Sequence, residues 1–500
     1  MNQSDSNVPG LVALGSRTGR LLILTTVAGS AVAQLTATVV NVALPTMATK
    51  LGANSSEQQW VINGYLLTLA SLILIGGSLG DRFGRLRVYR IGVAWFCVTS
   101  LLCALASNIT VLIAARLLQG VGAALLTPGS LAIIEATLRP QDRPRGVGEW
   151  SGLGGIASAV GPLIGGLLVA VSWRWIFLVN IPIALVAVVA SFGVPESHDP
   201  DARNAPLDWV GAFLTTSLLA SASYALIQGP EDSWGTLDLA AAALAVASLV
   251  ALMLWEPRVR APMLPIGLFK DRVFATANLV TFLVYGGMGV VFFLLPIQVQ
   301  VVAGFSPVAA GASMLPVTVL MFFLSPKVGD LNQRVGPRWP LAVGTMLIAI
   351  GTVLLRRVGP AADYTTDVLP AVLVFGLGLA LSVTTVTSAA LGSVSPAKAG
   401  AASGTNNAVS RTAQLMCIAA VPSLVGLTGS ALSEAGPLNA GFRQAMYINA
   451  ALVALGSLAA AVGLPSTSSG RGHEGAHDPQ ARQHRRFECP VDGAHASPEM

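Results

Sequence analysis

Fourteen long runs of apolar residues constrain this chain more than any other feature of its sequence. A transmembrane helix needs about 20 mostly apolar residues, whereas the strands of a membrane β-barrel alternate apolar and polar residues over about ten. The runs are long and continuous, so they predict an all-α polytopic membrane protein. The predicted transmembrane helices cover residues 21–44, 58–79, 90–107, 109–136, 147–170, 175–194, 208–228, 237–255, 274–299, 308–326, 340–356, 367–389, 401–426 and 442–463.

The composition fits a membrane protein, because 53% of the residues are apolar and 11% are charged, against about a quarter charged in soluble domains. The four cysteines form no CxxC pair and the five histidines lie outside the apolar runs, so we expect no metal site and no redox motif. The histidines and Cys489 of the polar C-terminal stretch are interpreted as part of a solvated tail. The absence of a Walker phosphate loop from the sequence argues against direct use of ATP, and no cofactor is expected.

Lysine and arginine residues indicate the orientation, because they are enriched in the cytoplasmic loops of membrane proteins. With the N-terminus inside, 22 of the 29 fall in cytoplasmic segments and five in outer loops. The remaining two, Arg116 and Arg411, lie inside predicted spans. We therefore expect both termini in the cytoplasm and the chain in the cytoplasmic (inner) membrane. The net charge of +5 then arises from loop residues and needs no nucleic-acid partner.

Two loops of the sequence are related by an internal repeat with a constant offset of 252 residues (329 − 77). The matching positions are Gly77 and Gly329, Leu79 and Leu331, Arg82 and Arg334, and Gly84 and Gly336. Such repeats are common in transporters and predict two six-helix bundles, with two further helices inserted between them. The expected divisions are an N-terminal segment (1–20), the first bundle (21–194), a loop (195–207), the inserted helices (208–256), a linker (257–273), the second bundle (274–463) and a disordered tail (464–500).

The first of these loops, with Gly77, Asp81, Arg82, Gly84 and Arg85, resembles the signature loop of the major facilitator superfamily. The layout of fourteen helices resembles its drug:proton antiporter branch. This resemblance implies an exporter of small lipophilic or amphipathic molecules that is driven by the proton gradient and functional as a monomer among membrane lipids.

The span at residues 147–170 contains a second motif of this kind. Gly161, Pro162, Gly165 and Gly166 resemble the motif that marks antiporters within the superfamily. Glycines four residues apart also permit close helix packing, and a proline permits a kink, so ordinary packing explains the same residues.

The signature loop has a physical interpretation as a conformational latch. Asp81, at a helix end, can pair with Arg85 or with the positive end of a neighbouring helix, and Gly84 permits a tight turn. Such a contact can form in one conformation of a transporter and break in the other. The alternative is that the arginines only set the topology. The second copy has Gln333 in place of Asp81, so a latch there would be weaker.

Two deep polar groups are candidates for the substrate or proton pathway. Arg116 lies within a span with Gln119 on the same helical face, where a charge is costly and is by default a functional hypothesis. The alternative is an arginine satisfied by backbone carbonyls. In the span at 401–426, Asn407, Arg411 and Gln414 form one polar stripe, which faces either a wet cavity or a neighbouring helix. Further candidates with neutral polar side chains are Asn41 and Gln300.

The first span departs from the family pattern, because Thr36 occupies a position where the family usually has an aspartate. The carboxylate of that aspartate is expected to take part in proton coupling. Glu149, near the inner end of the span that carries the antiporter motif, is our candidate for the proton carrier in place of that aspartate. The alternative is that Glu149 is a solvated residue at the membrane interface. Since the deep ionisable groups Arg116 and Arg411 are cationic, a neutral, zwitterionic or acidic substrate fits better than a cation.

We therefore expect a secondary exporter of amphipathic drugs or antibiotics that exchanges them for protons and has no catalytic residues. Two alternatives are an exporter or uniporter without proton coupling, which Thr36 favours, and a non-transporting sensor or scaffold on the same fold. A membrane enzyme is disfavoured, because no nucleophile with a base is found within the spans.

Overall fold

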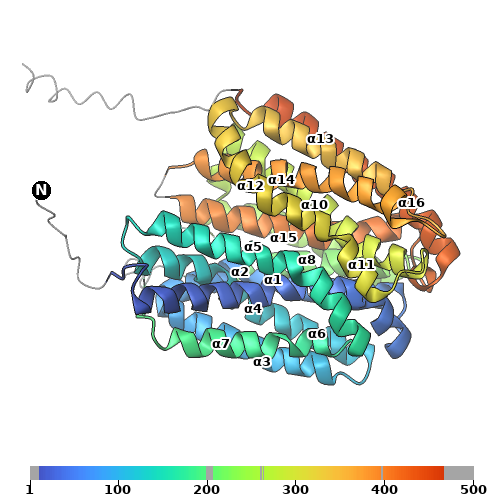
Figure 1. Cartoon of the computed structure of the whole chain (residues 1–500), viewed down its shortest axis with the longest axis horizontal. Helices are drawn as coiled ribbons and strands as arrows, with labels where there is room; N and C mark the ends of the chain where they lie inside the picture. The colour runs from blue at the N-terminus through green and yellow to red at the C-terminus, as the bar shows by residue number, and fades with distance from the viewer. Residues whose placement is uncertain (1–10, 199–206, 260–261, 263, 396–397, 467–500) are drawn as a thin grey trace, which may run out of the picture.

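The computed structural model describes residues 11–198, 207–259, 262, 264–395 and 398–466, which form a bundle of α-helices lying roughly along one another (Figure 1). The histidines of the tail and Cys489 lie outside these residues. The helices are α1 (Arg17–Leu51), α2 (Ser55–Phe83), α3 (Arg85–Leu105), α4 (Ile109–Thr137), α5 (Arg143–Val171), α6 (Trp175–Leu178), α7 (Asn180–Ser191), α8 (Trp209–Gln228), α9 (Thr236–Trp255), α10 (Arg272–Val301), α11 (Pro307–Ser313), α12 (Leu315–Val335), α13 (Arg338–Leu355), α14 (Leu369–Gly392), α15 (Ala399–Leu424) and α16 (Ala435–Gly463).

The prediction of an all-α polytopic protein is confirmed, but the predicted number of fourteen membrane spans is not. Within the described residues, eleven helical segments are both long enough and apolar enough to cross a membrane. The other three predicted spans coincide with α5, with α6 and α7, and with α15. Helix α5 opens with the charged residues Arg143, Arg145 and Glu149, and the apolar helix Trp175–Ser191 across α6 and α7 is shorter than the other spans. In α15 the polar residues Asn406, Asn407 and Arg411 lower the hydropathy of the helix.

The helices before and after α8 and α9 pack in the same pattern. In the first half, α4 packs against α2 and α3, α1 against α5 and α7, and α3 against α7. In the second half, α14 packs against α12 and α13, α10 against α15 and α16, and α13 against α16. The glycines of the repeated loops also correspond, because Gly84 (φ +106°) and Gly336 (φ +78°) end α2 and α12 with backbone angles that favour glycine. In Figure 1 the two halves lie one above the other.

The inserted helices α8 and α9 pack against each other, and α8 also contacts α2 of the first half and α15 of the second. Asp208 joins the two helices at one end. Its Oδ1 atom accepts hydrogen bonds from the Gly211 backbone N–H (2.8 Å) and from Nε1 of Trp255 (2.9 Å). The carboxylate therefore acts here as a helix cap and a cross-link between α8 and α9.

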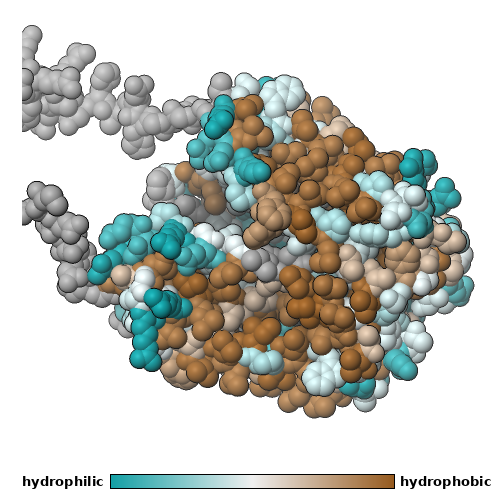
Figure 2. Space-filling view, viewed as in Figure 1, coloured by the Kyte–Doolittle hydropathy of each residue, from teal (hydrophilic) through white to brown (hydrophobic). Residues whose placement is uncertain are grey.

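The surface of the bundle is apolar between two polar ends (Figure 2). Large apolar side chains are exposed along the inserted helix α9, where Leu237, Val246 and Met253 are 72%, 63% and 60% exposed. An apolar surface of this kind is unfavourable in water and is expected where a helix faces lipid. The space-filling view therefore agrees with a multi-pass membrane protein.

Candidate functional site

The two halves meet at the end of the bundle opposite the signature loop, which we call the distal end. The loop between α15 and α16 contacts the start of α2, because the Ser55 backbone N–H donates to the Gly429 carbonyl oxygen (2.7 Å). The Leu432 N–H donates to Oγ of Ser55 (3.0 Å), and Nε2 of Gln58 donates to Oγ of Ser433 (3.4 Å). These bonds close the distal end.

Gln300, a candidate for the substrate or proton pathway, belongs to this distal contact. Its Nε2 atom donates to the backbone carbonyl oxygen of Val42 in α1 (3.0 Å), across the boundary between the halves. It also donates to the Pro296 carbonyl oxygen of its own helix (2.9 Å). The amide therefore joins α10 to α1, which gives it a role in closure.

The antiporter motif of α5 packs on both halves. A Cβ atom at Gly161 would lie 3.2 Å from Cβ of Thr38, and one at Gly165 would lie 3.2 Å from Cα of Val39, so both glycines permit close packing of α5 on α1. Gly166 faces the other half, because a Cβ atom there would lie 2.8 Å from Cα of Val308 in α11. Gly311 of α11 packs on α5 in the same way, because a Cβ atom added there would lie 2.8 Å from the carbonyl carbon of Pro162.

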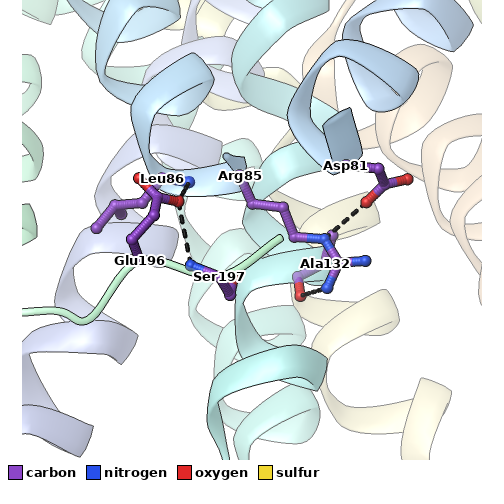
Figure 3. A network of polar contacts seen from close by, with 6 residues as sticks. All are labelled: Asp81, Arg85, Leu86, Ala132, Glu196 and Ser197. Atoms are coloured by element: carbon purple, nitrogen blue, oxygen red, sulfur yellow. Dashed lines mark hydrogen bonds and ion pairs between the residues drawn. The ribbon is translucent and has the colours of Figure 1, made fainter. Parts of the chain in front are cut away.

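The signature loop forms the ionic contact that the sequence predicts. Nε of Arg85 lies 2.7 Å from Oδ1 of Asp81, and Nη1 of Arg85 donates to the Ala132 carbonyl oxygen of α4 (3.5 Å) (Figure 3). The loop is thereby tied to α4. Arg82 stacks near the ring of Phe83 at 5.4 Å, and Gly77 lies in ordinary contact with Pro128.

Glu196, in the segment after α7, is a further member of this network that sequence reasoning missed. Its Oε1 atom accepts hydrogen bonds from the backbone N–H groups of Leu86 (2.8 Å) and Ser197 (3.1 Å) (Figure 3). The Arg85 N–H donates to the Ser197 carbonyl oxygen (2.9 Å). Glu196 thus supplies the N-terminal cap of α3 that Gly84, which has no side chain, cannot provide.

The second copy of the loop uses a neutral contact at the corresponding place. Oγ1 of Thr385 in α14 donates to Oδ1 of Asn332 (3.0 Å), so α12 is tied to α14 as the signature loop is tied to α4. The contact carries no charge, consistent with the weaker latch expected where Gln333 replaces the aspartate.

Among the side chains that the structure describes, Arg116 is the largest that is fully buried, with 1% of its surface exposed. Its Nε atom donates to the Val61 carbonyl oxygen of α2 (2.9 Å), and its Nη1 atom donates to Oε1 of Gln119 (2.6 Å). Nε2 of Gln119 in turn donates to Oγ of Ser100 in α3 (2.8 Å). The guanidinium carbon lies 4.4 Å from the ring centre of Tyr65, a cation–π contact. The predicted shared face of Arg116 and Gln119 is confirmed by their hydrogen bond.

The polar stripe of α15 lies near the boundary between the halves, where Asn407, Arg411 and Gln414 are each partly exposed. The helix of Arg411, α15, packs against α2 and α10, which carry Tyr65 and Tyr285. The sequence did not indicate that the neighbouring Asn406 would make the helix contact. Its Nδ2 atom donates to Oδ1 of Asn278 (3.1 Å) and Oγ1 of Thr281 (2.9 Å) in α10.

Thr36 and Asn41 are buried in α1 at 0% and 8% exposure. The Thr36 hydroxyl and Oδ1 of Asn41 have no hydrogen-bond partner within the described residues, and Nδ2 of Asn41 donates to the Ala37 carbonyl oxygen (3.3 Å). Glu149 lies apart from both, pairs with Arg145 (3.1 Å) and lines a cavity of about 240 Å³ with Arg20. The proton-carrying role of Glu149 stays a prediction.

Comparison with curated proteins identifies relatives that include antibiotic resistance proteins. The methylenomycin A resistance protein of Bacillus subtilis is 40% identical over 308 residues, which are 60% of this chain and 65% of that protein. The tetracenomycin C resistance and export protein of Streptomyces glaucescens is 35% identical over 65% of this chain and 61% of that protein. The match thus spans less than two thirds of these two relatives. The puromycin resistance protein of Streptomyces alboniger is 35% identical over 80% of this chain and 81% of that protein.

Solved structures show the same fold at low sequence identity. A POT family transporter in complex with 5-aminolevulinic acid has a TM-score of 0.67 at 12% identity, with 89% of this chain and 97% of that chain covered. The D-xylose-proton symporter has a TM-score of 0.63 at 15% identity, with 90% and 99% covered. The family model described as Major Facilitator Superfamily matches residues 26–418, most of the repeated bundle. The chain therefore belongs to the Major Facilitator Superfamily of membrane transporters.

Proposed function

We propose that this protein is a secondary active exporter that moves small amphipathic drugs or antibiotics across the cytoplasmic membrane in exchange for protons. The observation that carries the proposal is a duplicated bundle closed at the distal end, with a buried polar group, Arg116, between its helices. A scaffold would have no need of such a group. The relatives named for antibiotic resistance and export support an outward direction of transport.

The finer topology is part of the proposal. Counting α6 with α7, and α11 with α12, as single broken spans gives fourteen crossings and two inserted helices within the described residues. Both termini and the signature loop then lie in the cytoplasm, and the distal end faces outward. On this assignment the closed contacts face outward, the protein works as a monomer, and alternating access would open the distal end.

Uptake of a labelled panel of antibiotics into everted membrane vesicles tests the proposal. Vesicles energised by respiration should accumulate at least one compound, and a protonophore should abolish the accumulation. Arg116→Gln, which removes the buried charge, should abolish it as well, with Arg443→Gln on the exposed face of α16 as the matched control. Absence of uptake across the panel would count against an exporter.

Export without proton coupling is the second candidate, and the first half of the bundle favours it. In the described residues, each acidic side chain of that half is in a loop or within two turns of a helix end. Thr36, at the usual position of the coupling aspartate, cannot carry a proton. Uptake that survives the protonophore, and vesicles whose internal pH does not change on addition of substrate, would establish this candidate instead.

A further inference from the structure

We infer that the substrates of this protein carry an acidic group, which binds between Arg116 of the first half and Arg411 of the second. The inference rests on the proposed exporter and names the charge of its substrate. It goes beyond the general preference of two arginines for an anion, because Arg411 lies on α15, which packs on α2, and α2 carries the Tyr65 ring that stacks on Arg116.

The two arginines have no acidic partner in the part of the chain that the structure describes. The ion pairs found there are Asp81–Arg85 and Arg145–Glu149, and both belong to the signature-loop end of the bundle. Arg116 is held by neutral acceptors, and Nε of Arg411 is buried with no hydrogen-bond partner. An uncompensated charge among apolar helices is costly, so its retention points to an anion that arrives from outside the chain.

Helix α2 connects the two charges. The guanidinium of Arg116 lies 4.4 Å from the ring centre of Tyr65 on α2, and α2 packs against α15, which carries Arg411. The Tyr65 hydroxyl makes only a long hydrogen bond, of 3.4 Å, to the Ala33 carbonyl oxygen of α1. Tyr285 lies on α10, which also packs against α15. Each half therefore contributes one arginine and one tyrosine, all of them potential donors to a carboxylate or phenolate.

The two arginines also differ in burial and in the number of hydrogen bonds that hold them. Arg116 is fully buried and fixed by two hydrogen bonds, whereas Arg411 is partly exposed. Arg116 would therefore orient an acidic substrate, and Arg411 would complete its binding site. Because the arginines belong to different halves, separation of the halves would weaken the site.

Ligand binding to the purified full-length protein tests this inference separately from transport. Salicylate and its neutral amide, salicylamide, have nearly the same shape and differ in charge. Salicylate should raise the midpoint of thermal unfolding more than salicylamide does, and Arg411→Gln should remove the difference. Arg411→Lys should retain part of it, and Arg443→Gln, an exposed arginine on α16, should leave it unchanged. Equal shifts for acid and amide in the parent protein would overturn the inference.

A pair of dyes relates this binding to export. Fluorescein and rhodamine 123 share a xanthene ring system but are anionic and cationic. Everted vesicles should accumulate fluorescein in preference to rhodamine 123, and Arg411→Gln should reduce the fluorescein uptake by about tenfold. Preference for rhodamine 123 would overturn the inference and leave the exporter standing. Selective salicylate binding with no transport of any compound would instead contradict the exporter alone.

A different observation gives a role to the inserted helices: we propose that α8 and α9 clamp the distal end shut. The Gly429 N–H donates to Oε2 of Glu231 in the loop between α8 and α9 (2.8 Å). The carbonyl oxygen of the same Gly429 accepts from Ser55 of the first half (2.7 Å). One residue of the second half is thus bonded to the first half and to the insertion at once, while α8 packs on α2 and α15.

The neighbouring acidic residue provides a matched control for the clamp. Glu231→Ala removes the acceptor, whereas Asp232→Ala removes the same charge from an exposed position one residue further on. Spin labels on the exposed positions Lys50 and Gly436 would report the distance between the halves at the distal end. Glu231→Ala should increase the population with a long distance by roughly tenfold, the equivalent of one hydrogen bond to a charged group. An unchanged distance distribution, or an equal change in Asp232→Ala, would overturn the proposal.

Discussion

Gly166→Ala should shift the equilibrium between the two conformations of the bundle. The added Cβ atom would lie 2.8 Å from Cα of Val308 and against the Pro307 carbonyl oxygen, both backbone atoms of the other half. Backbone atoms yield less readily than the end of a flexible side chain, so the halves must separate locally. Overpacking of this kind costs about 1–3 kcal/mol. The contact exists only while the distal end is closed, so the closed conformation should lose about 5–150-fold in population relative to the open one.

Distance measurement between spin labels at Lys50 and Gly436 is the assay, in a variant whose four cysteines are replaced by serine. Gly152→Ala is the matched control, because it lies on the same helix, α5, and a Cβ atom there has no neighbour within 4 Å. Both variants gain about 1 kcal/mol of helix propensity, which cancels in the comparison. Gly166→Ala should lengthen the mean distance and Gly152→Ala should leave it unchanged. Identical distributions for the two variants would refute the argument that Gly166 permits distal closure.

Three further variants test the signature loop and the buried arginine. Glu196→Ala should lower the free energy of unfolding by about 1 kcal/mol through loss of the α3 cap, as measured by chemical denaturation, whereas His198→Ala should have no effect. Gly84→Ala should lower the thermal stability far more than Gly80→Ala, because Gly84 has φ +106° and a Cβ there would lie 3.0 Å from the Glu196 carboxyl carbon. Gln119→Glu should preserve the fold but reduce fluorescein uptake by about tenfold, because the new carboxylate would neutralise Arg116; unreduced uptake would contradict the role of that charge.

Local spacing explains which contacts could be predicted from the sequence. Arg116 with Gln119, three residues apart, and Asp81 with Arg85, four residues apart, are neighbours on any helix or tight helical turn. The contact of Glu196 with Leu86 joins residues 110 apart in the chain, and no pattern in one sequence indicates that pairing. The duplicated halves were predictable for a different reason, because repetition of a loop needs no knowledge of distant contacts.

Orientation around a helix explains the partial success in α15. The spacing predicted a polar stripe of Asn407, Arg411 and Gln414, and these residues are partly exposed. Asn406 lies one residue, or about 100°, away from the stripe and faces α10 instead. Gln300 was likewise recognisable as a polar residue in a span, but its partner, the Val42 carbonyl, is a backbone group with no sequence signal. Side-chain type thus predicted that these residues were unusual without predicting what they contact.

The chemistry of the distal contacts suits a transporter that must open and close repeatedly. Four hydrogen bonds named above join the halves there: Ser55 to Gly429, Leu432 to Ser55, Gln58 to Ser433, and Gln300 to Val42. All are between neutral groups, and such a bond contributes a net of about 0.5–1.5 kcal/mol, so together they amount to roughly 2–6 kcal/mol. A ligand can shift a conformational equilibrium only by the difference in its affinity for the two states, and a few kcal/mol is within that range. A buried ion pair across the same boundary would cost more to separate, so neutral closure keeps both conformations accessible.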